Sequence, residues 1–313
     1  MSAEQCRILL GPQRPTINLG EAVAQANLPP GPLAVISAGW QEAENDIDQL
    51  REITGRSLED LCLYRRAEEV FAADERIARD YRRRQDRLKE QQRLYRLRLK
   101  PLARAARDIL GREGHADMLA AEQRHAISQL RALDRHHLHR TESLHREFEE
   151  THNTTATPLL AQHHDAVQEI LERCSGVVIT GGNVAILLNR LRLFGVDELL
   201  AEQAIIAWSA GAMVLGERVV LFHDRTPQGR RDPEVFGAGC GVLRGFVVMP
   251  DAAQRLREKD RDRAGLISRR FAPDVCLLLD SGAALQLDGL AATSADNVRR
   301  INHDGRFTKV RTA

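Results

Sequence analysis

The sharpest candidate for chemistry in this sequence is a serine that follows a short apolar run. Residues 204–208 are typical of a buried strand, and Ser209 comes directly after them, followed by Ala210, Gly211 and Ala212. Small residues beside a serine suit a tight turn from strand to helix, which exposes the hydroxyl at the carboxyl end of a sheet. The N-terminus of the following helix favours a developing oxyanion. The pattern therefore predicts a nucleophile elbow with Ser209 as an acyl-transfer nucleophile.

Donors for the oxyanion are predicted at the end of a second apolar run. Residues 176–180 read as a strand and continue into Gly181, Gly182 and Asn183. The carboxyl ends of parallel strands meet at one edge of a sheet, where ligands bind. We expect the backbone N–H of Ala210 to be one donor, and the glycine turn to supply another. The four candidate oxyanion or substrate-binding residues are therefore Gly181, Gly182, Asn183 and Ala210.

These two motifs together resemble a known family. A Gly-Gly-Asn at a strand end, about 26 residues before a Ser-Ala-Gly-Ala elbow, resembles peptidase family S51, which includes peptidase E, an aspartyl dipeptidase, and cyanophycinase. Residues 236–248 look like the family's segment leading to its catalytic histidine, and residues 280–285 look like a later segment. The resemblance covers roughly residues 1–65 and 175–290, without the helical part between them.

The resemblance implies a fold related to class I glutamine amidotransferases and a small peptide as substrate. It also implies that Ser209 forms an acyl-enzyme while the amides of Gly182 and Ala210 hold the oxyanion. No cofactor and no metal are expected.

Two positions depart from the pattern of the family. The family places its histidine just after residues 245–248, and this chain has Asp251 there and no histidine in residues 249–255. In the cyanophycinase-like branch an acidic residue is expected near Ser281, where serine stands. An ordinary aspartate has a pKa of about 3.9, so Asp251 would be a weak base at neutral pH.

A replacement base is available in His223, which follows the strand after the elbow helix. Asp224 or Asp251 would orient it. The alternative is that His223 is a surface loop residue. On that interpretation the chain is an inactive family member that serves as a protein- or polyanion-binding module.

The surrounding elements predict an α/β fold with a doubly wound, mostly parallel sheet. Apolar runs at 7–11 and 33–39 alternate with a helical pattern at 42–54, as in a parallel sheet with crossovers. After a helix expected from Pro158 to Cys174, further apolar runs continue the α/β pattern. These runs lie at 176–180, 204–208, 219–222, 245–249 and 275–279.

A long helical hairpin is expected between the two α/β parts. Residues 66–150 contain almost no Gly or Pro, apolar residues recur every seven positions from Tyr81 to Ile109, and 111–114 suits a turn. Pro101 is expected to kink the first helix. We predict three units: residues 1–65 and 158–313 for the α/β domain, and 66–157 for the inserted hairpin. The apolar stripes on both arms suggest docking on the domain or a partner, and so predict a homo-oligomer.

The net charge of +1, from 45 basic and 44 acidic residues, excludes a protein that is basic throughout. The charge is distributed unevenly along the chain, because residues 76–107 hold 13 basic and only three acidic side chains. This segment is the basis for nucleic acid or another polyanion as an alternative partner. A second basic run, 254–270, is either a solvated amphipathic helix or a surface that attracts acidic peptides or an α-carboxylate. His136 and His139 share a helix face, but no further ligand completes a metal site.

The compartment is predicted to be the cytoplasm. No apolar run reaches about 18 residues, so no membrane-spanning helix is expected. The N-terminal residues lack a secretory leader, and the five cysteines form no C-x-x-C pair. These features favour reduced thiols in a cytosolic protein.

Overall fold

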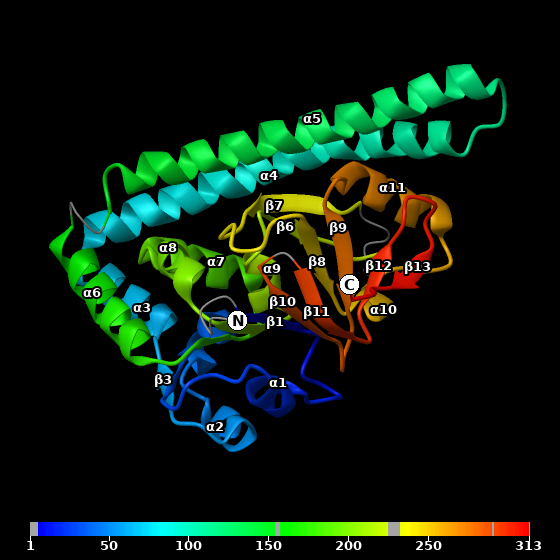
Figure 1. Cartoon of the computed structure of the whole chain (residues 1–313). Coiled ribbons are helices and arrows are strands. Elements are labelled where there is room, and N and C mark those ends of the chain that lie inside the picture. Colours follow the sequence, from blue (N-terminus) through cyan, green and yellow to red (C-terminus); the bar gives the residue numbers. More distant parts are fainter. Residues whose placement is uncertain (1–5, 154–156, 225–231, 290, 313) are drawn as a thin grey trace.

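The computed structural model describes residues 6–153, 157–224, 232–289 and 291–312 (Figure 1). The chain begins with β1 (Cys6–Leu10), α1 (Leu19–Gln25), β2 (Leu33–Ile36), the 3₁₀ segment η2 (Ala38–Ala43), α2 (Asp48–Thr54), β3 (Leu58–Asp60) and α3 (Leu63–Ala73). Two long helices follow, α4 (Glu75–Leu110) and α5 (Ala116–Glu149). Next come α6 (Pro158–Arg173), β4 (Val177–Ile179), α7 (Val184–Leu193), α8 (Val196–Leu199), η3 (Leu200–Glu202), β5 (Ile205–Trp208) and α9 (Ala210–Val214). The remaining elements are β6 (Arg218–Leu221), β7 (Glu234–Ala238), β8 (Phe246–Pro250), α10 (Ala252–Arg255), α11 (Arg261–Phe271), β9 (Val275–Leu279), β10 (Ala284–Asp288), β11 (Ala291–Asp296), β12 (Arg299–Ile301) and β13 (Phe307–Lys309).

The central sheet is mixed and mostly parallel. In the described part of the chain its strands lie in the order β11-β10-β1-β5-β4-β2-β3. The run from β1 to β3 is parallel, and β10 and β11 are antiparallel additions at one edge. Strands β2 and β5 are buried along their whole length, as expected where a parallel sheet is covered on both faces. The prediction of an α/β fold with a mostly parallel central sheet is confirmed.

The later apolar runs form strands as predicted, but they do not join the central sheet. Strands β8 and β9 pair in parallel within a separate sheet of order β13-β12-β9-β8. Strands β6 and β7 form an antiparallel pair of their own. The apolar pattern identified the strands, whereas their partners depend on contacts distant in the sequence.

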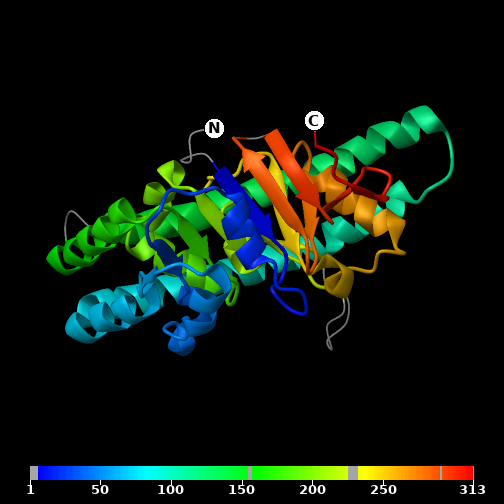
Figure 2. The ribbon, with the colours of Figure 1, turned by 60° about the horizontal axis from the view of Figure 1, so that its bottom comes forward.

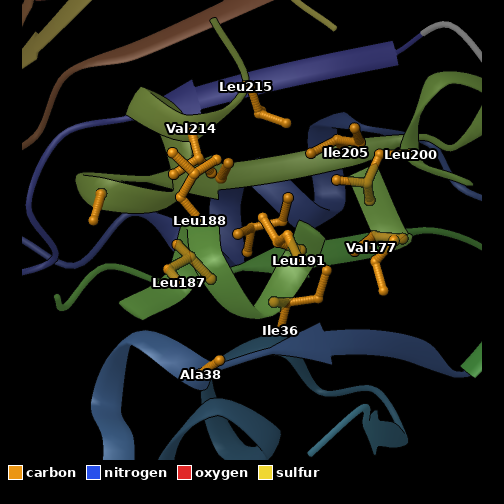
Figure 3. Packing of buried hydrophobic residues seen from close by; sticks show 14 of the residues in the cluster. Ile36, Ala38, Val177, Leu187, Leu188, Leu191, Leu200, Ile205, Val214 and Leu215 are labelled. Carbon is orange, nitrogen blue, oxygen red and sulfur yellow. The ribbon is translucent and has the colours of Figure 1, made fainter. Parts of the chain in front are cut away.

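The leucines of α7 pack this helix onto the central sheet. Leu187, Leu188 and Leu191 lie on one face of this helix and pack toward Val177 and Ile205 of the sheet (Figure 3). All of these side chains are buried. Burying such a side chain contributes roughly 1.5–3 kcal/mol. The packing therefore fixes the start of α7, which carries the Gly-Gly-Asn turn, against the sheet.

The helical segment is interrupted once more than its sequence suggests. Asp74 has an extended backbone and its carboxylate accepts hydrogen bonds from Arg76 N (2.9 Å) and Ile77 N (3.1 Å), so it separates α3 from α4. Helix α4 then continues through Pro101 to Leu110. The turn predicted at 111–114 lies between α4 and α5.

Helices α4 and α5 lie side by side across the α/β part, and both views show them extending past it at one end (Figures 1 and 2). Tyr81 and Tyr95 of the predicted stripe are buried, and Leu88, Leu102 and Ile109 are half-buried. Much of the stripe therefore packs within this chain. The homo-oligomer that it suggested stays a prediction.

A buried polar cluster attaches the hairpin to α11. Arg270 Nε donates to Asp134 Oδ2 at 2.7 Å, and Arg270 Nη2 donates to the Tyr95 hydroxyl at 2.6 Å. That hydroxyl donates to Asp134 Oδ1 at 2.8 Å. The ring of His137 stacks on Tyr95 with centroids 4.1 Å apart. One cluster thus joins α4, α5 and α11.

The cysteines and the helices bear on the predictions about thiols and membrane spans. All five cysteines are free thiols, as the sequence predicted. No helix of the described residues is long and apolar enough to cross a bilayer. Residues 1–5, on which the leader prediction rests, lie outside the described part.

Buried His137 is expected to make stability depend on pH. Burial lowers its pKa to about 4, so between pH 6.5 and about 4 the unfolded chain binds a proton here that the folded chain does not. The free energy of unfolding therefore falls with decreasing pH in this window, by about 1.4 kcal/mol per pH unit for this group. The substitution His137→Phe keeps the stacking on Tyr95 and should flatten the dependence by that amount in urea unfolding. Exposed His139→Gln should keep the wild-type slope, and a wild-type slope for His137→Phe would contradict the prediction.

Candidate active site

Ser209 lies in the turn between β5 and α9 with φ 50° and ψ −116°. A non-glycine residue with positive φ is strained and persists only where its surroundings hold it, often at functional sites. Ser209 N donates to Leu10 O of the neighbouring β1 at 3.3 Å, and Ser209 O accepts from Met213 N at 3.0 Å. The turn is thus held from the sheet on one side and from α9 on the other.

Gly211 allows α9 to start directly against the end of β4. A Cβ at this position would lie 2.4 Å from Ile179 O and 2.7 Å from Thr180 O, which no side chain tolerates. The same close packing brings Gly181 beside the serine, since a Cβ on Gly181 would lie 3.1 Å from Ser209 Cβ. The two predicted motifs are therefore adjacent in space.

The glycine turn is supported by Gly39, a residue that the sequence analysis missed. Gly182 has φ 113°, and a Cβ on it would lie 2.4 Å from Gly39 O. That same oxygen accepts a hydrogen bond from Asn183 N at 2.8 Å. The side chain of Asn183 caps α7, since its Oδ1 accepts from Ala185 N at 3.0 Å. The amide oxygen of Asn183 is therefore engaged in helix capping.

A pocket of about 500 Å³ contains most of the predicted site residues. Ser209, Gly182, Ala210, His223 and Asp251 all line it. Gly181 lines a neighbouring pocket of about 330 Å³, and Ser209 and Gly182 line both. The other described residues that line the larger pocket are Pro12, Arg96, Val184, Met213, Leu221, Phe222, Asp232, Glu234, Pro250 and Arg255.

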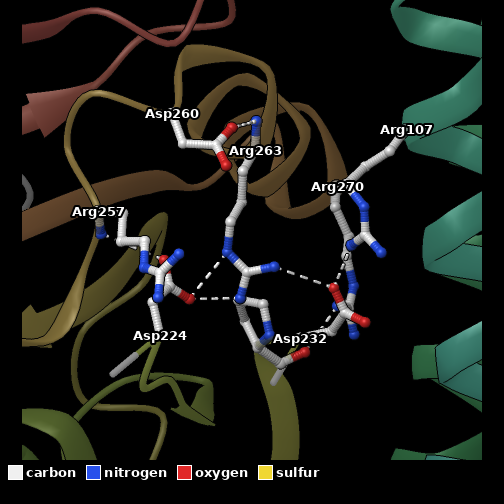
Figure 4. A network of polar contacts seen from close by, with 8 residues as sticks. Arg107, Asp224, Asp232, Arg257, Asp260, Arg263 and Arg270 are labelled. Atoms are coloured by element: carbon white, nitrogen blue, oxygen red, sulfur yellow. Dashed lines mark hydrogen bonds and ion pairs between the residues drawn. The ribbon is translucent and has the colours of Figure 1, made fainter. Parts of the chain in front are cut away.

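Asp224, one of the predicted partners of His223, is engaged by an arginine. Its carboxylate accepts from Arg263 Nε at 2.8 Å and from Arg257 N at 3.2 Å (Figure 4). Arg263 Nη1 also donates to Asp232 at 3.1 Å, and Arg107 of α4 pairs with Asp232. Both Asp224 and Arg263 are buried. The segment beside His223 is therefore anchored through Asp224 to α11.

Asp251 begins α10 in a left-handed backbone conformation, with φ 58° and ψ 37°. Its amide donates to Leu279 O at 2.9 Å, and its carboxylate lies 3.6 Å from Arg255 Nε. Ser281, at the position where an acidic residue was expected, accepts a hydrogen bond from Thr16 N at 3.0 Å. Asp251 lines the Ser209 pocket, whereas the Ser281 hydroxyl accepts from the loop that contains Thr16.

The long helix contributes to the pocket, which the sequence analysis did not foresee. Arg96 of α4 lines the pocket and its Nε lies 2.6 Å from Glu234 Oε2 on β7. Gln92 Nε2, one turn earlier, donates to the same carboxylate at 3.2 Å. Nothing local in the sequence connects Arg96 with Glu234, because only the packing of α4 across β7 brings them together.

In the described part of the chain, no three His, Cys, Asp or Glu side chains come together in a way that would hold a metal ion. His136 and His139 are exposed on α5.

The profile of peptidase family S51 matches residues 131–294, just over half of the chain. The chain therefore belongs to peptidase family S51. The match includes the segment with Ser209 and extends into α5, which the resemblance did not cover. No curated protein matches the chain. A crystal structure of a peptidase from an acI-B1 Actinobacterium is similar, with a TM-score of 0.44 and 14% identity over 95% of this chain and 91% of that one.

The close approach at Gly211 gives a direct test of the turn. Gly211→Ala places a methyl group against two backbone oxygens, so we expect a loss of about 1–3 kcal/mol in the free energy of unfolding. Gly237→Ala is the matched control, because a Cβ there meets nothing within 4 Å. Urea unfolding of both variants measures the difference. Equal stability of the two variants would show that α9 does not pack against β4 in this way.

Proposed function

We propose that this member of the S51 family is a serine-type hydrolase that cleaves peptide or isopeptide bonds through Ser209. The observation that carries the proposal is the strained turn of Ser209, which opens on a pocket shared with His223. A serine nucleophile needs a base in its pocket, and strain of this kind is typical of functional positions. The sharp turn from β5 to α9 supports interpretation as a nucleophile elbow.

In the proposed reaction, His223 accepts the proton of the Ser209 hydroxyl as the oxygen attacks the carbonyl carbon of the substrate. The tetrahedral oxyanion is held by the N–H groups of Gly182 and Ala210. His223 then returns the proton to the leaving amine, and water releases the acyl group by the reverse sequence. Asp251 lines the same pocket and is the residue that would orient His223 in this proposal.

Labelling with a fluorophosphonate probe tests this proposal. The wild-type chain should be labelled at Ser209, and Ser209→Ala should not be labelled. His223→Ala should slow labelling by about 100-fold or more, because general-base catalysis contributes on that order. Asn153→Ala changes a residue that is distant in sequence from the pocket residues, and it controls for effects of mutation and purification on labelling. Absence of Ser209-dependent labelling in folded protein would exclude an activated nucleophile.

A second proposed function, binding of a polyanion, is supported by a groove on α5. The groove has a volume of about 610 Å³ and is lined by Arg124, Arg131, Arg135, Arg269 and His303, with no carboxylate among its described lining residues. The three arginines of α5 span roughly 16 Å along the helix at 1.5 Å per residue. This spacing suits an extended anionic chain, such as single-stranded nucleic acid, better than a single phosphate. From the sequence, the basic segment 76–107, which lies in α4, was the basis for this alternative function.

Fluorescence anisotropy with a labelled single-stranded oligonucleotide tests the groove. The double variant Arg124→Ala/Arg135→Ala should bind more weakly and reduce the slope of log K against log salt by about 1–2. The double variant Arg79→Ala/Arg82→Ala, on the exposed face of α4, should bind like the wild type. The opposite ranking would assign the function to α4, and absence of binding in wild type at low salt would remove this second function.

A further inference from the structure

A separate cavity of about 250 Å³ lies between the long helices and the α/β part. It shares Arg96 and Leu221 with the Ser209 pocket, so the two are neighbours. The other described residues that line it are Gln85, Leu88, Lys89, Gln92, Thr141, His145, Ala185, Leu188, Asn189, Phe236 and Gly237. Its walls therefore come from α4, α5, α7, β6 and β7.

Much of the wall is apolar, and its amide and hydroxyl groups already have partners. Asn189 Oδ1 accepts from Gln85 Nε2 at 3.0 Å, and Asn189 Nδ2 donates to Ala185 O at 2.7 Å. Thr141 Oγ1 donates to Leu138 O at 2.9 Å. These groups are occupied by the fold, so the apolar side chains around them define the shape of the cavity.

His145 is the exception among the polar groups of this wall. Its side chain is buried, and its Nδ1 makes no hydrogen bond within the described residues. Burial, and next the nearby Arg192 and Arg84, lower its pKa to about 2, so the ring is neutral at physiological pH. A neutral imidazole carries one donor and one acceptor, and leaving either of them unused in a buried site is costly.

The charges around the cavity restrict what it can hold. Lys89 and Arg96 line it, and no carboxylate does among the described residues. Although Arg96 is paired with Glu234 and Lys89 with Asp86, a cationic ligand would find no carboxylate among the described lining residues, so it is disfavoured. A cavity of about 150 Å³ is enough for one benzene ring, so this one has room for a substituted ring.

We propose that this cavity binds an uncharged aromatic hydroxyl compound, a phenol, whose ring packs on Leu188 and Phe236 and whose hydroxyl forms a hydrogen bond with His145. The phenol would be a free small molecule or the side chain of a tyrosine in a peptide. The proposal does not depend on Ser209 being a nucleophile.

Gly237 offers a way to fill the cavity without disturbing its walls. Gly237 is buried and lines the cavity, yet a Cβ on it would have no atom within 4 Å. A larger side chain at this position would therefore extend into the empty space. Gly237→Leu fills the cavity, while Gly237→Ala adds only one methyl group and serves as the matched control.

The binding experiment is ¹⁹F NMR with the full-length chain and three probes of similar size: 4-fluorophenol, 4-fluorotoluene and 4-fluorobenzylammonium. We expect 4-fluorophenol to bind about fivefold more tightly than 4-fluorotoluene, as one hydrogen bond would give. The ammonium probe should not bind. His145→Phe should abolish the preference for the hydroxyl, and Gly237→Leu should remove binding of both neutral probes, while Gly237→Ala and Ser209→Ala should retain it.

Competition by the peptide Gly-Tyr-Gly, with Gly-Ala-Gly as control, separates the two sources of the phenol. Displacement by the tyrosine peptide alone assigns the cavity to a peptide side chain, and no displacement assigns it to a free molecule. The proposal is overturned if 4-fluorophenol does not bind, if Gly237→Leu leaves its binding unchanged in folded protein, or if it binds no better than 4-fluorotoluene. Fluorophosphonate labelling of the same samples reports separately on the nucleophile.

Discussion

Arg270 is a guanidinium group almost completely removed from water, and the position of the long helices depends on how it is neutralised. It donates to both carboxylate oxygens of Asp134 on α5, to the hydroxyl of Tyr95 on α4 and to Pro233 O beside β7. Removing one partner of a buried ion pair costs about 3–5 kcal/mol, so these elements are held together on α11. The location of β7, and with it the wall of the pocket that carries Glu234, follows from this one buried charge.

Arginine acts inside this protein as much as on its surface. Only four of the 45 basic residues are lysines. Arg263 and Arg270 belong to the second basic run, 254–270, yet both are buried in ion pairs. Arg84, from the basic segment of α4, is buried over the ring of Phe148. A planar guanidinium with five donors can join several acceptors at once, which suits it to these junctions. Charge counted along the sequence therefore overstates the charge available to a partner.

Features that depend on local pattern were predictable from the sequence, and features that depend on packing between distant segments were not. Strands β1, β2, β4 and β5 of the central sheet, the turn at Ser209 and the two long helices follow from the apolar periodicity and the small residues, whereas β3, β10 and β11 were not predicted. The support of Gly182 by Gly39 and the presence of Arg96 in the pocket arise between segments far apart in the chain. The stacking of His137 on Tyr95 likewise joins two helices, α5 and α4, whose residues here are about 40 positions apart in the chain.

The contact between Gly39 and Gly182 has a consequence for the order of folding. The two glycines are separated by roughly 140 residues, and closing so long a loop is entropically costly and slow. The pairing of α4 with α5 is local and shortens the loop that must be closed. During synthesis, β1, β2 and β3 emerge from the ribosome well before β4 and β5, which lie between β1 and β2 in the sheet. We therefore expect the central strands to insert between earlier ones, and the surroundings of Ser209 to assemble after the helical pair.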